Sequence, residues 1–244
     1  VTALVQRPSL PLRLRPRPDD VVAVHVQKRL HLRQRARSTA HRSSCSGNLK
    51  QIAFGHISYS DEYNDFIAAG IRWPGNIVWP TTLAPYLGKN ATGKIFFCPA
   101  STEENSKSMK DFVALHETSF KFGEDARLSY GQNVNLSQQR TTREYHKRGN
   151  FKHPSRTVVI LDGNMPKAPD EGVVAHYTYT QTPAEASGKA FFGTEYGHSI
   201  GINLNFLDGH VEYINSTLML RARTNKGHAY WGKFGFNWSV TDNN

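Results

Sequence analysis

The sequence predicts an α+β fold in which an N-terminal helix packs on an antiparallel β-sheet. Three stretches carry this prediction. Residues 43–60 place apolar side chains at helical spacing, residues 157–161 form an unbroken β-prone run, and residues 197–214 alternate apolar and polar side chains around an Asp-Gly pair. Helical spacing and strict alternation are the periodicities that distinguish helices from half-buried strands. We therefore expect one helix, one sheet and long loop insertions between the strands.

The helical stretch has a single apolar face. Its small and apolar residues recur at the spacing of one helix face: Leu49, Ile52, Ala53, Ile57 and Ser60. We expect this helix to extend back into residues 33–42 and to end in the polar segment 61–65.

The stretch 197–214 predicts a β-hairpin. Apolar residues occupy alternate positions on both sides of the Asp208-Gly209 pair: Ile202, Leu204, Phe206, Val211 and Tyr213. Asp-Gly between alternating apolar residues is typical of a two-residue type I′ hairpin loop. Such a loop would pair Phe206 with Val211 and Leu204 with Tyr213, and would put all five apolar side chains on one face.

The remaining elements are shorter. Residues 157–161 lack polar alternation, so we expect a central strand that is covered on both faces. The other expectations are strands at residues 95–98 and 128–133, a short helix at 81–87, and long connections at 100–127 and 180–193.

The positive charge is concentrated at one end of the chain. The formal net charge is +10 over 244 residues. Residues 1–44 hold ten Lys and Arg against two Asp, a surplus of 8, which leaves a surplus of 2 for residues 45–244. The nearly neutral remainder gives no argument for a nucleic-acid partner.

Residues 1–44 differ from the rest in kind, so we predict a basic, irregular segment 1–44 and a head domain 45–244. Four prolines oppose a helix in the first half of the segment. Residues 21–26 are apolar but far shorter than the roughly 20 residues that cross a bilayer. Two interpretations stay open: a disordered tail on a divergent soluble protein, or a segment translated from a wrong frame or gene start. The abrupt change near Cys45 favours the second.

Five short motifs resemble those of prepilin-type, pseudopilin-like bacterial proteins. His198, nine intervening residues and Asp208-Gly209 are similar to their H-X9-DG signature. Cys45, followed by Asn48, Leu49, Lys50 and Gln51, resembles their C-x-x-N-L-K-Q-I segment. The others, in the expected order, are Phe97-Cys98-Pro99, Ser129-Tyr130-Gly131-Gln132-Asn133, and Pro154-Ser155 through Asp162.

This resemblance implies a pilin-like fold, with the N-terminal stem helix packed on the sheet, and no catalytic residues. It also implies a non-enzymatic structural subunit of a pseudopilus or type IV pilus-like filament, acting in protein secretion at the bacterial cell envelope. The expected partners are filament subunits, the secretion apparatus and the inner membrane. The apolar helix that reaches the membrane in such proteins is missing from the sequence given.

The two cysteines are too few for a zinc site or a disulfide-stapled miniprotein. Two separate buried thiols are one interpretation. The resemblance favours a Cys45–Cys98 disulfide instead, because it places the chain outside the cytoplasm, where such bonds persist.

Other chemistry finds weaker support, and we expect no cofactor. His198, Asp208 and His210 contain metal-ligand types, but Asp208-Gly209 is explained as a turn. The resemblance leaves calcium open, because some related pseudopilins hold Ca²⁺ in a loop near the sheet. That site is not matched residue by residue here, and the oxygen donors Asp162, Asn164 and Asp170 form a composition that ordinary loops share. No nucleophile elbow or phosphate-binding glycine loop is present, which disfavours an enzyme. The alternative function is an envelope carbohydrate-binding module, whose aromatic residues lie in 230–238.

Overall fold

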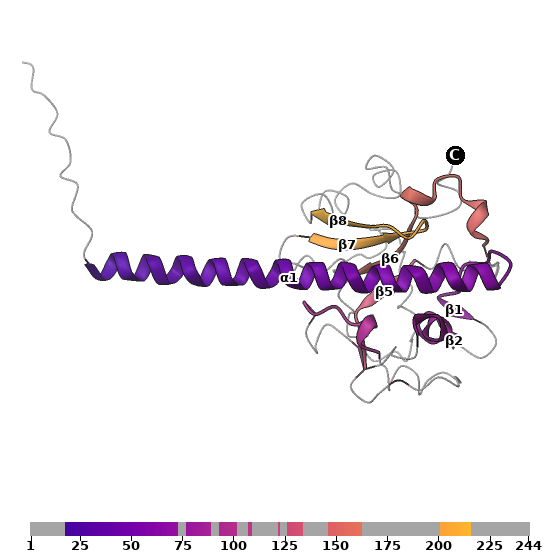
Figure 1. Cartoon of the computed structure of the whole chain (residues 1–244), viewed down its shortest axis with the longest axis horizontal. Helices are drawn as coiled ribbons and strands as arrows, with labels where there is room; N and C mark the ends of the chain where they lie inside the picture. The colour runs from indigo at the N-terminus through magenta and orange to yellow at the C-terminus, as the bar shows by residue number, and fades with distance from the viewer. Residues whose placement is uncertain are drawn as a thin grey trace, which may run out of the picture. The chain divides into compact units, whose positions relative to one another are not determined.

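The structure is a computed structural model, and its coloured parts in Figure 1 are the ones described here. It describes residues 18–72, 77–88, 93–101, 107–108, 122, 126–133, 146–162 and 201–215. Their side chains are described from His25 onward, except those of residues 71–72, 77–78, 107–108 and 215. The chain divides into two compact units, Val1–Arg37 and Ser38–Asn244, which we describe separately. This boundary lies seven residues before the one that the sequence suggested at residues 44 and 45.

The helix α1 runs from Pro18 to Glu62. Proline is tolerated in the first turn of a helix, because the N–H group that it lacks has no intrahelical partner there. The extension through residues 33–42 is confirmed, and the irregular conformation expected for residues 1–44 is wrong from Pro18 onward. The four prolines that opposed a helix all lie at or before its first residue.

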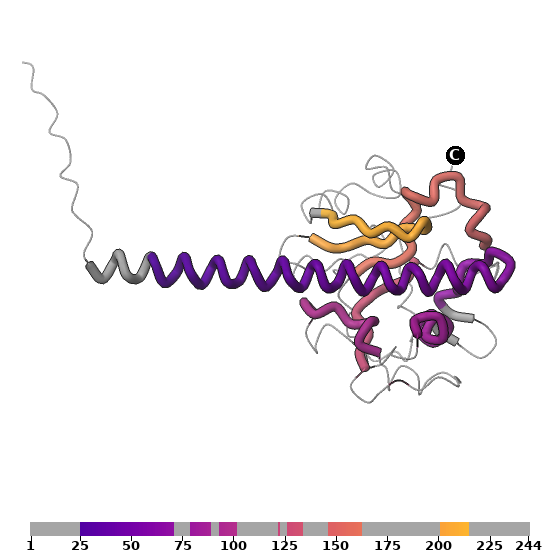
Figure 2. Tube along the Cα trace, viewed as in Figure 1, coloured from indigo at the N-terminus to yellow at the C-terminus, as the bar shows by residue number. Residues whose placement is uncertain are grey.

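The helix ends in the polar segment, as predicted. Asn64 and Asp65 have φ angles of 51° and 68°, a left-handed conformation that Asn and Asp adopt more readily than other side chains. The chain turns there, as the tube in Figure 2 shows. None of the helices in the described part of the chain is long and apolar enough to span a bilayer.

The main sheet has four antiparallel strands in the order β5 (Tyr130–Gln132), β6 (Val158–Asp162), β7 (Gly201–Phe206) and β8 (Val211–Asn215). Every residue of β6 and β7 is buried. The prediction of a central, doubly covered strand at residues 157–161 is therefore confirmed by β6. Together with α1, this sheet makes the fold α+β.

The hairpin forms, but its predicted register is wrong by one residue. The observed pairs are Asn205 with Val211 and Asn203 with Tyr213. The Gly209 N–H donates to the Phe206 carbonyl at 2.9 Å, and within this loop only Gly209 has a positive φ, of 91°. A type I′ turn needs positive φ at both central residues. The loop is instead a three-residue connection with glycine at its left-handed position.

This shift exchanges the partners of the apolar side chains across the hairpin. Val211 and Tyr213 share a face with Asn203 and Asn205 instead of with Leu204. That face lies against α1: the Arg42 guanidinium sits 4.5 Å from the Tyr213 ring centre. Figure 1 shows β7 and β8 beside the C-terminal part of the helix.

Shorter elements connect the helix to the sheet. The short helix expected at residues 81–87 is confirmed by α2 (Trp79–Leu83) and the 3₁₀ turn η1 (Ala84–Leu87). The strand expected at 95–98 is wrong, because η2 (Lys94–Phe96) forms a 3₁₀ turn whose hydrogen bonds are satisfied locally. The others are β1 (Ile71–Arg72), β2 (Ile77–Val78), β3 (Lys107–Ser108), β4 (Arg127–Leu128), η3 (Arg148–Asn150) and η4 (Pro154–Arg156).

The core of the second unit lies between α1 and the sheet. Cys45, Leu49 and Ile52 come from successive turns of the helix and are fully buried. They pack in one cluster with buried side chains of other elements: Trp79, Leu83, Phe96, Leu128, Tyr130, Val159 and Ile160. The predicted apolar helix face is therefore the face that joins helix and sheet.

Candidate functional site

Three side chains with metal-ligand or redox chemistry meet in this core. Cys45 comes from α1, Cys98 follows η2, and Asp162 is the last residue of β6. Their sulfur and carboxylate oxygen atoms all lie within 4.8 Å of one another. All three residues are buried, with 0%, 3% and 3% of their surface exposed. We call these three residues the thiol–carboxylate cluster.

The Asp162 carboxylate is held from several sides. The Cys45 thiol donates to Oδ2 at 2.9 Å. Asn203 on β7 donates twice, from its backbone N–H to Oδ1 and from its side-chain amide to Oδ2, both at 3.0 Å. A buried carboxylate needs such donors, because the loss of water is otherwise strongly unfavourable. The end of β6 is thereby tied to both α1 and β7.

A second layer of hydrogen bonds surrounds the cluster. The Asn48 side-chain amide donates to the Phe97 carbonyl at 3.0 Å and to the Tyr130 hydroxyl at 3.3 Å. The Cys98 N–H donates to Ser129 Oγ at 2.5 Å. Asn48, one turn after Cys45, thus connects the helix to the segments that carry the second cysteine and β5.

The protonation states follow from burial. Burial is the largest cause that raises the pKa of the Cys45 thiol, and the neighbouring Cys98 and Asp162 raise it further. Burial, followed by the charges of the two cysteines, likewise raises the pKa of Tyr130 well above its usual value. Both groups are therefore neutral at neutral pH, and the Cys45 thiol is the hydrogen-bond donor to Asp162.

Four of the five sequence motifs converge on this one place. Asn48 and Leu49 face inward, and Leu49 is fully buried, whereas Lys50 and Gln51 are exposed. The cysteines are brought together as the disulfide prediction requires. Both are free thiols in the structure, and their bond stays a prediction.

The Asp208-Gly209 motif lies away from the cluster, at the tip of the hairpin. Asp208 Oδ1 accepts from the His210 N–H at 3.1 Å and lies 2.6 Å from His210 Nδ1. A Cβ built on Gly209 would lie 3.0 Å from Cδ1 of Ile57 on α1. The motif therefore shapes a turn that packs on the helix. His198 lies outside the described residues.

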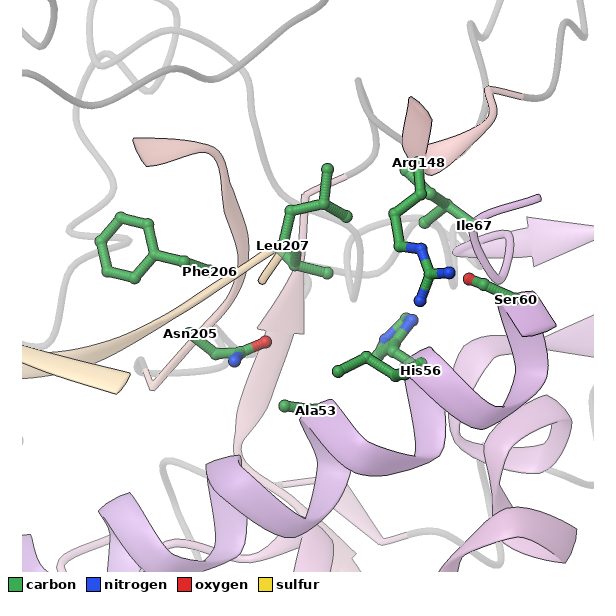
Figure 3. Close-up of a pocket in the computed structure, with 10 residues that line it drawn as sticks. Ala53, His56, Ser60, Ile67, Arg148, Asn205, Phe206 and Leu207 are labelled. Atoms are coloured by element: carbon green, nitrogen blue, oxygen red, sulfur yellow. The ribbon is translucent and has the colours of Figure 1, made fainter. Parts of the chain in front are cut away.

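A second buried polar group lies further along the same helix. His56 is buried on α1, with its ring 6.3 Å from that of Trp79, and neither ring nitrogen has a hydrogen-bond partner in the described structure. Burial lowers its pKa to about 3. Figure 3 shows the side chains of His56, Ser60, Arg148 and Asn205. They line a cavity of about 10 Å³. This volume is near the smallest that holds one water molecule.

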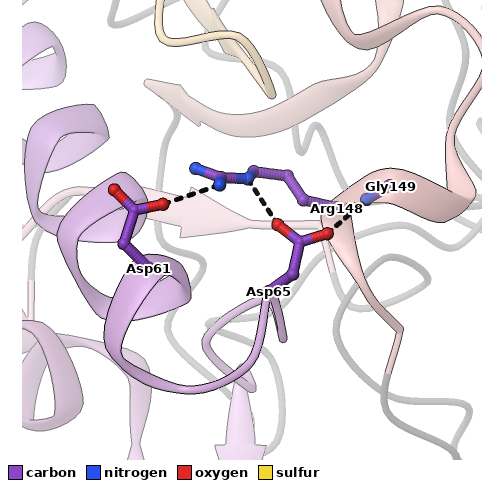
Figure 4. A network of polar contacts seen from close by, with 4 residues as sticks. All are labelled: Asp61, Asp65, Arg148 and Gly149. Carbon is purple, nitrogen blue, oxygen red and sulfur yellow. Dashed lines mark hydrogen bonds and ion pairs between the residues drawn. The ribbon is translucent and has the colours of Figure 1, made fainter.

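An ionic network closes that end of the helix (Figure 4). Arg148 donates from Nε to Asp65 at 2.9 Å and from a terminal nitrogen to Asp61 at 2.7 Å. The second oxygen of Asp65 accepts the Gly149 N–H at 2.7 Å. The network fixes the turn after α1 to η3. Its carboxylates are partly exposed, so its contribution to stability is small.

Sequence reasoning did not identify Asp162, Tyr130 and Asn203 as partners of the cysteines. The sequence offers Asp162 as a calcium donor with Asn164 and Asp170, but those two lie outside the described residues. In the structure both oxygens of Asp162 accept hydrogen bonds from Asn203, and one also accepts the Cys45 thiol. The sequence does contain one indication: Asp162 ends the most apolar strand, and an acidic side chain in such a place needs a buried partner.

Comparison with known proteins identifies one family. The model of a family described as "Protein of unknown function (DUF1559)" matches residues 34–196, about two thirds of the chain. The matched range includes Cys45, Cys98 and Asp162, and it ends before His198. No curated protein and no solved structure matches the chain.

Proposed function

This chain belongs to the DUF1559 family, a family of bacterial envelope proteins often with prepilin-like N-terminal regions, and we propose that it is a non-enzymatic structural subunit of a pilus-like filament in the envelope. The family match supports the envelope location. The arrangement of α1 and the sheet supports the filament role, because it is the arrangement expected of a pilin-like stem helix and head.

The observation that carries the proposal is the uncovered part of α1. From residue 25 to residue 44 no side chain of the helix is buried, whereas Cys45, Leu49 and Ile52 are completely buried. Val26 and Leu30 are exposed by 51% and 54%. A helix that is polar and exposed over several turns gains little stability by itself. In a filament, contact with neighbouring subunits whose surfaces offset the positive charge of residues 25–44 would supply the missing packing.

Site-specific photo-crosslinking in the living bacterium tests this role. A photoreactive residue at Leu30 on the uncovered part should give a ladder of crosslinked multimers in the envelope fraction. The same residue at Phe54 is the matched control, because Phe54 is on the same helix and is also exposed, by 70%, but lies within the second unit. We expect the Leu30 ladder to be several-fold stronger than the Phe54 ladder.

Monomer alone at both positions, with the protein present in the envelope, would contradict a filament subunit. A pull-down with purified cell-wall polysaccharide on the same material then addresses the carbohydrate-binding alternative. Binding that is lost on truncation after residue 229 would favour that function instead, although its aromatic residues lie outside the described part of the chain.

A further inference from the structure

We propose that the thiol–carboxylate cluster of Cys45, Cys98 and Asp162 is a binding site for one thiophilic divalent cation of the Zn²⁺ type. The three donor atoms already lie within 4.8 Å of one another. Because Zn–S and Zn–O bonds are about 2.3 and 2.0 Å long, ligand atoms around one zinc ion lie roughly 3–4 Å apart. Small side-chain adjustments therefore bring all three within bonding distance of a single ion.

The donor set suits this class of metal. Thiolates select zinc and related soft ions over magnesium or calcium, and the oxygen of an Asp or Glu carboxylate is also a zinc ligand. Two cysteines alone are too few for a zinc site, as expected from the sequence, but that expectation considers only sulfur ligands. The third ligand is an aspartate from β6, 117 residues from Cys45 in the chain.

The surrounding residues provide what a metal site needs beyond its ligands. Asn203 donates two hydrogen bonds to Asp162 and so fixes the direction of its carboxylate. Such outer hydrogen bonds orient ligands and raise metal affinity. The Tyr130 hydroxyl accepts from the Asn48 side chain, which ties β5 to the helix turn that carries Cys45.

Binding exchanges protons for metal. The two thiols lose their protons to solvent as two metal–sulfur bonds form, so one M²⁺ enters and two H⁺ leave. The ion then holds two thiolates and one carboxylate, and no redox partner is required. Because the three ligands come from α1, the segment after η2 and β6, the ion would clamp the helix to the sheet.

A Cys45–Cys98 disulfide is the competing state of the same sulfurs. It would use two of the three groups and would remove the thiol hydrogen that Asp162 Oδ2 now accepts. The buried carboxylate therefore favours the metal, because only metal binding engages all three residues. The clamp would act in the same way whether or not the chain assembles into filaments.

Metal loading of the full chain tests the proposal. Protein refolded under reducing, oxygen-free conditions with Zn²⁺ or Co²⁺ should hold one ion per chain by elemental analysis. The Co²⁺ form should show the near-ultraviolet absorption of sulfur–cobalt bonds. Zinc should also protect both thiols from alkylation and raise the melting temperature by several degrees, in proportion to the logarithm of free zinc.

Two variants identify the ligands. Asp162→Asn keeps the size and both cysteines but removes the charge, so zinc affinity should fall at least tenfold. Asp208→Asn removes a carboxylate at the hairpin tip and should leave zinc affinity unchanged. The alkylation assay on the unaltered chain needs no variant, so a folding defect in Asp162→Asn does not remove the test.

Three results would overturn the proposal. They are zinc binding below one ion per ten chains, equal zinc affinity in Asp162→Asn and the unaltered chain, and a Cys45–Cys98 peptide in metal-free protein isolated unreduced from the bacterial envelope. The last result would establish the disulfide instead.

Discussion

The two ends of the buried face of α1 differ in whether their buried polar side chains are hydrogen-bonded. At one end, Cys45 donates to Asp162, which also accepts two hydrogen bonds from Asn203. Three turns later, His56 is also buried, but neither of its ring nitrogens has a hydrogen-bond partner in the described structure. The same helix face thus carries one organised polar site and one polar side chain without hydrogen bonds.

Buried polar side chains can therefore stabilise a particular arrangement of elements when they are hydrogen-bonded, and destabilise the fold when they are not. A fully paired buried network fixes the relative positions of the elements that contribute to it. An unpaired buried imidazole costs free energy and remains only because other packing is sufficient. Here the paired end joins α1, β6 and β7, whereas the His56 end is covered by the hairpin tip and bordered by the partly exposed ion pairs of Arg148, which contribute little to stability.

The largest effect is expected from breaking the paired end. Asp162→Ala removes the acceptor of the Cys45 thiol and of the Asn203 N–H, and leaves the Asn203 side-chain amide only the Arg42 carbonyl at 3.4 Å. Each unpaired buried donor costs about 1–3 kcal/mol, so we expect the free energy of unfolding to fall by roughly 3 kcal/mol or more. Urea denaturation of reduced protein in the presence of a chelator measures this without any contribution from metal.

Glu212→Ala is the matched control, because Glu212 is an exposed carboxylate on β8 of the same sheet. We expect it to change the free energy of unfolding by less than about 0.5 kcal/mol. Equal losses in the two variants would show that the Asp162 hydrogen bonds do not organise the core.

At the His56 end, we expect the free energy of unfolding to depend on pH. The pKa of His56 is about 3 in the folded protein and 6.5 when unperturbed. Between these values the unfolded chain binds a proton that the folded chain excludes, so stability is complete above pH 6.5 and falls as the pH decreases toward 3. From pH 7 to pH 5 we expect a loss of about 2 kcal/mol from this residue.

His56→Leu should remove that contribution to the pH dependence and should raise stability at pH 7 by about 1–2 kcal/mol, since no polar group remains unpaired. Urea melts of both proteins at pH 5 and pH 7 give the comparison. Lower stability of the leucine variant at pH 7 would mean that a water in the adjacent cavity hydrogen-bonds the imidazole, and the contrast between the two ends would then disappear.

The organised end was partly predictable from sequence. The helical spacing of Leu49 and Ile52 identified the buried helix face, and the apolar run at residues 157–161 identified the central strand. The meeting of Cys45 with Asp162 was not predictable, because it depends on contacts between residues 117 positions apart. Local periodicity contains no information on which strand end faces which helix turn.

The register of the hairpin was not predictable from the sequence, for a different reason. Alternation and Asp-Gly correctly indicated two paired strands, but both two-residue and three-residue loops accept glycine at a left-handed position. The predicted register places all five apolar side chains on one face. In the structure Asn203 and Asn205 lie on the face toward α1, where Asn203 has Asp162 as its acceptor. Apolar alternation therefore predicts the wrong register here, because Asn203 belongs to a buried hydrogen-bond network and occupies a buried face.

The smallest effect is expected at the hairpin tip, which covers the His56 end. Gly209→Val places a β-branched side chain at a φ of 91° and brings its Cβ to 3.0 Å from Ile57 Cδ1. Strain of this kind costs about 1–3 kcal/mol, and because the flexible Ile57 side chain can move away, we expect a loss near 1.5 kcal/mol.

Asp208→Asn is the control: an amide oxygen can still accept the His210 N–H, so its loss should be below about 0.5 kcal/mol. A role of Asp208 as a metal or catalytic group predicts instead that the asparagine variant stays folded and loses its envelope function. Thermal melts, together with the crosslinking ladder from Leu30, distinguish a turn that acts through folding from one that acts through its charge.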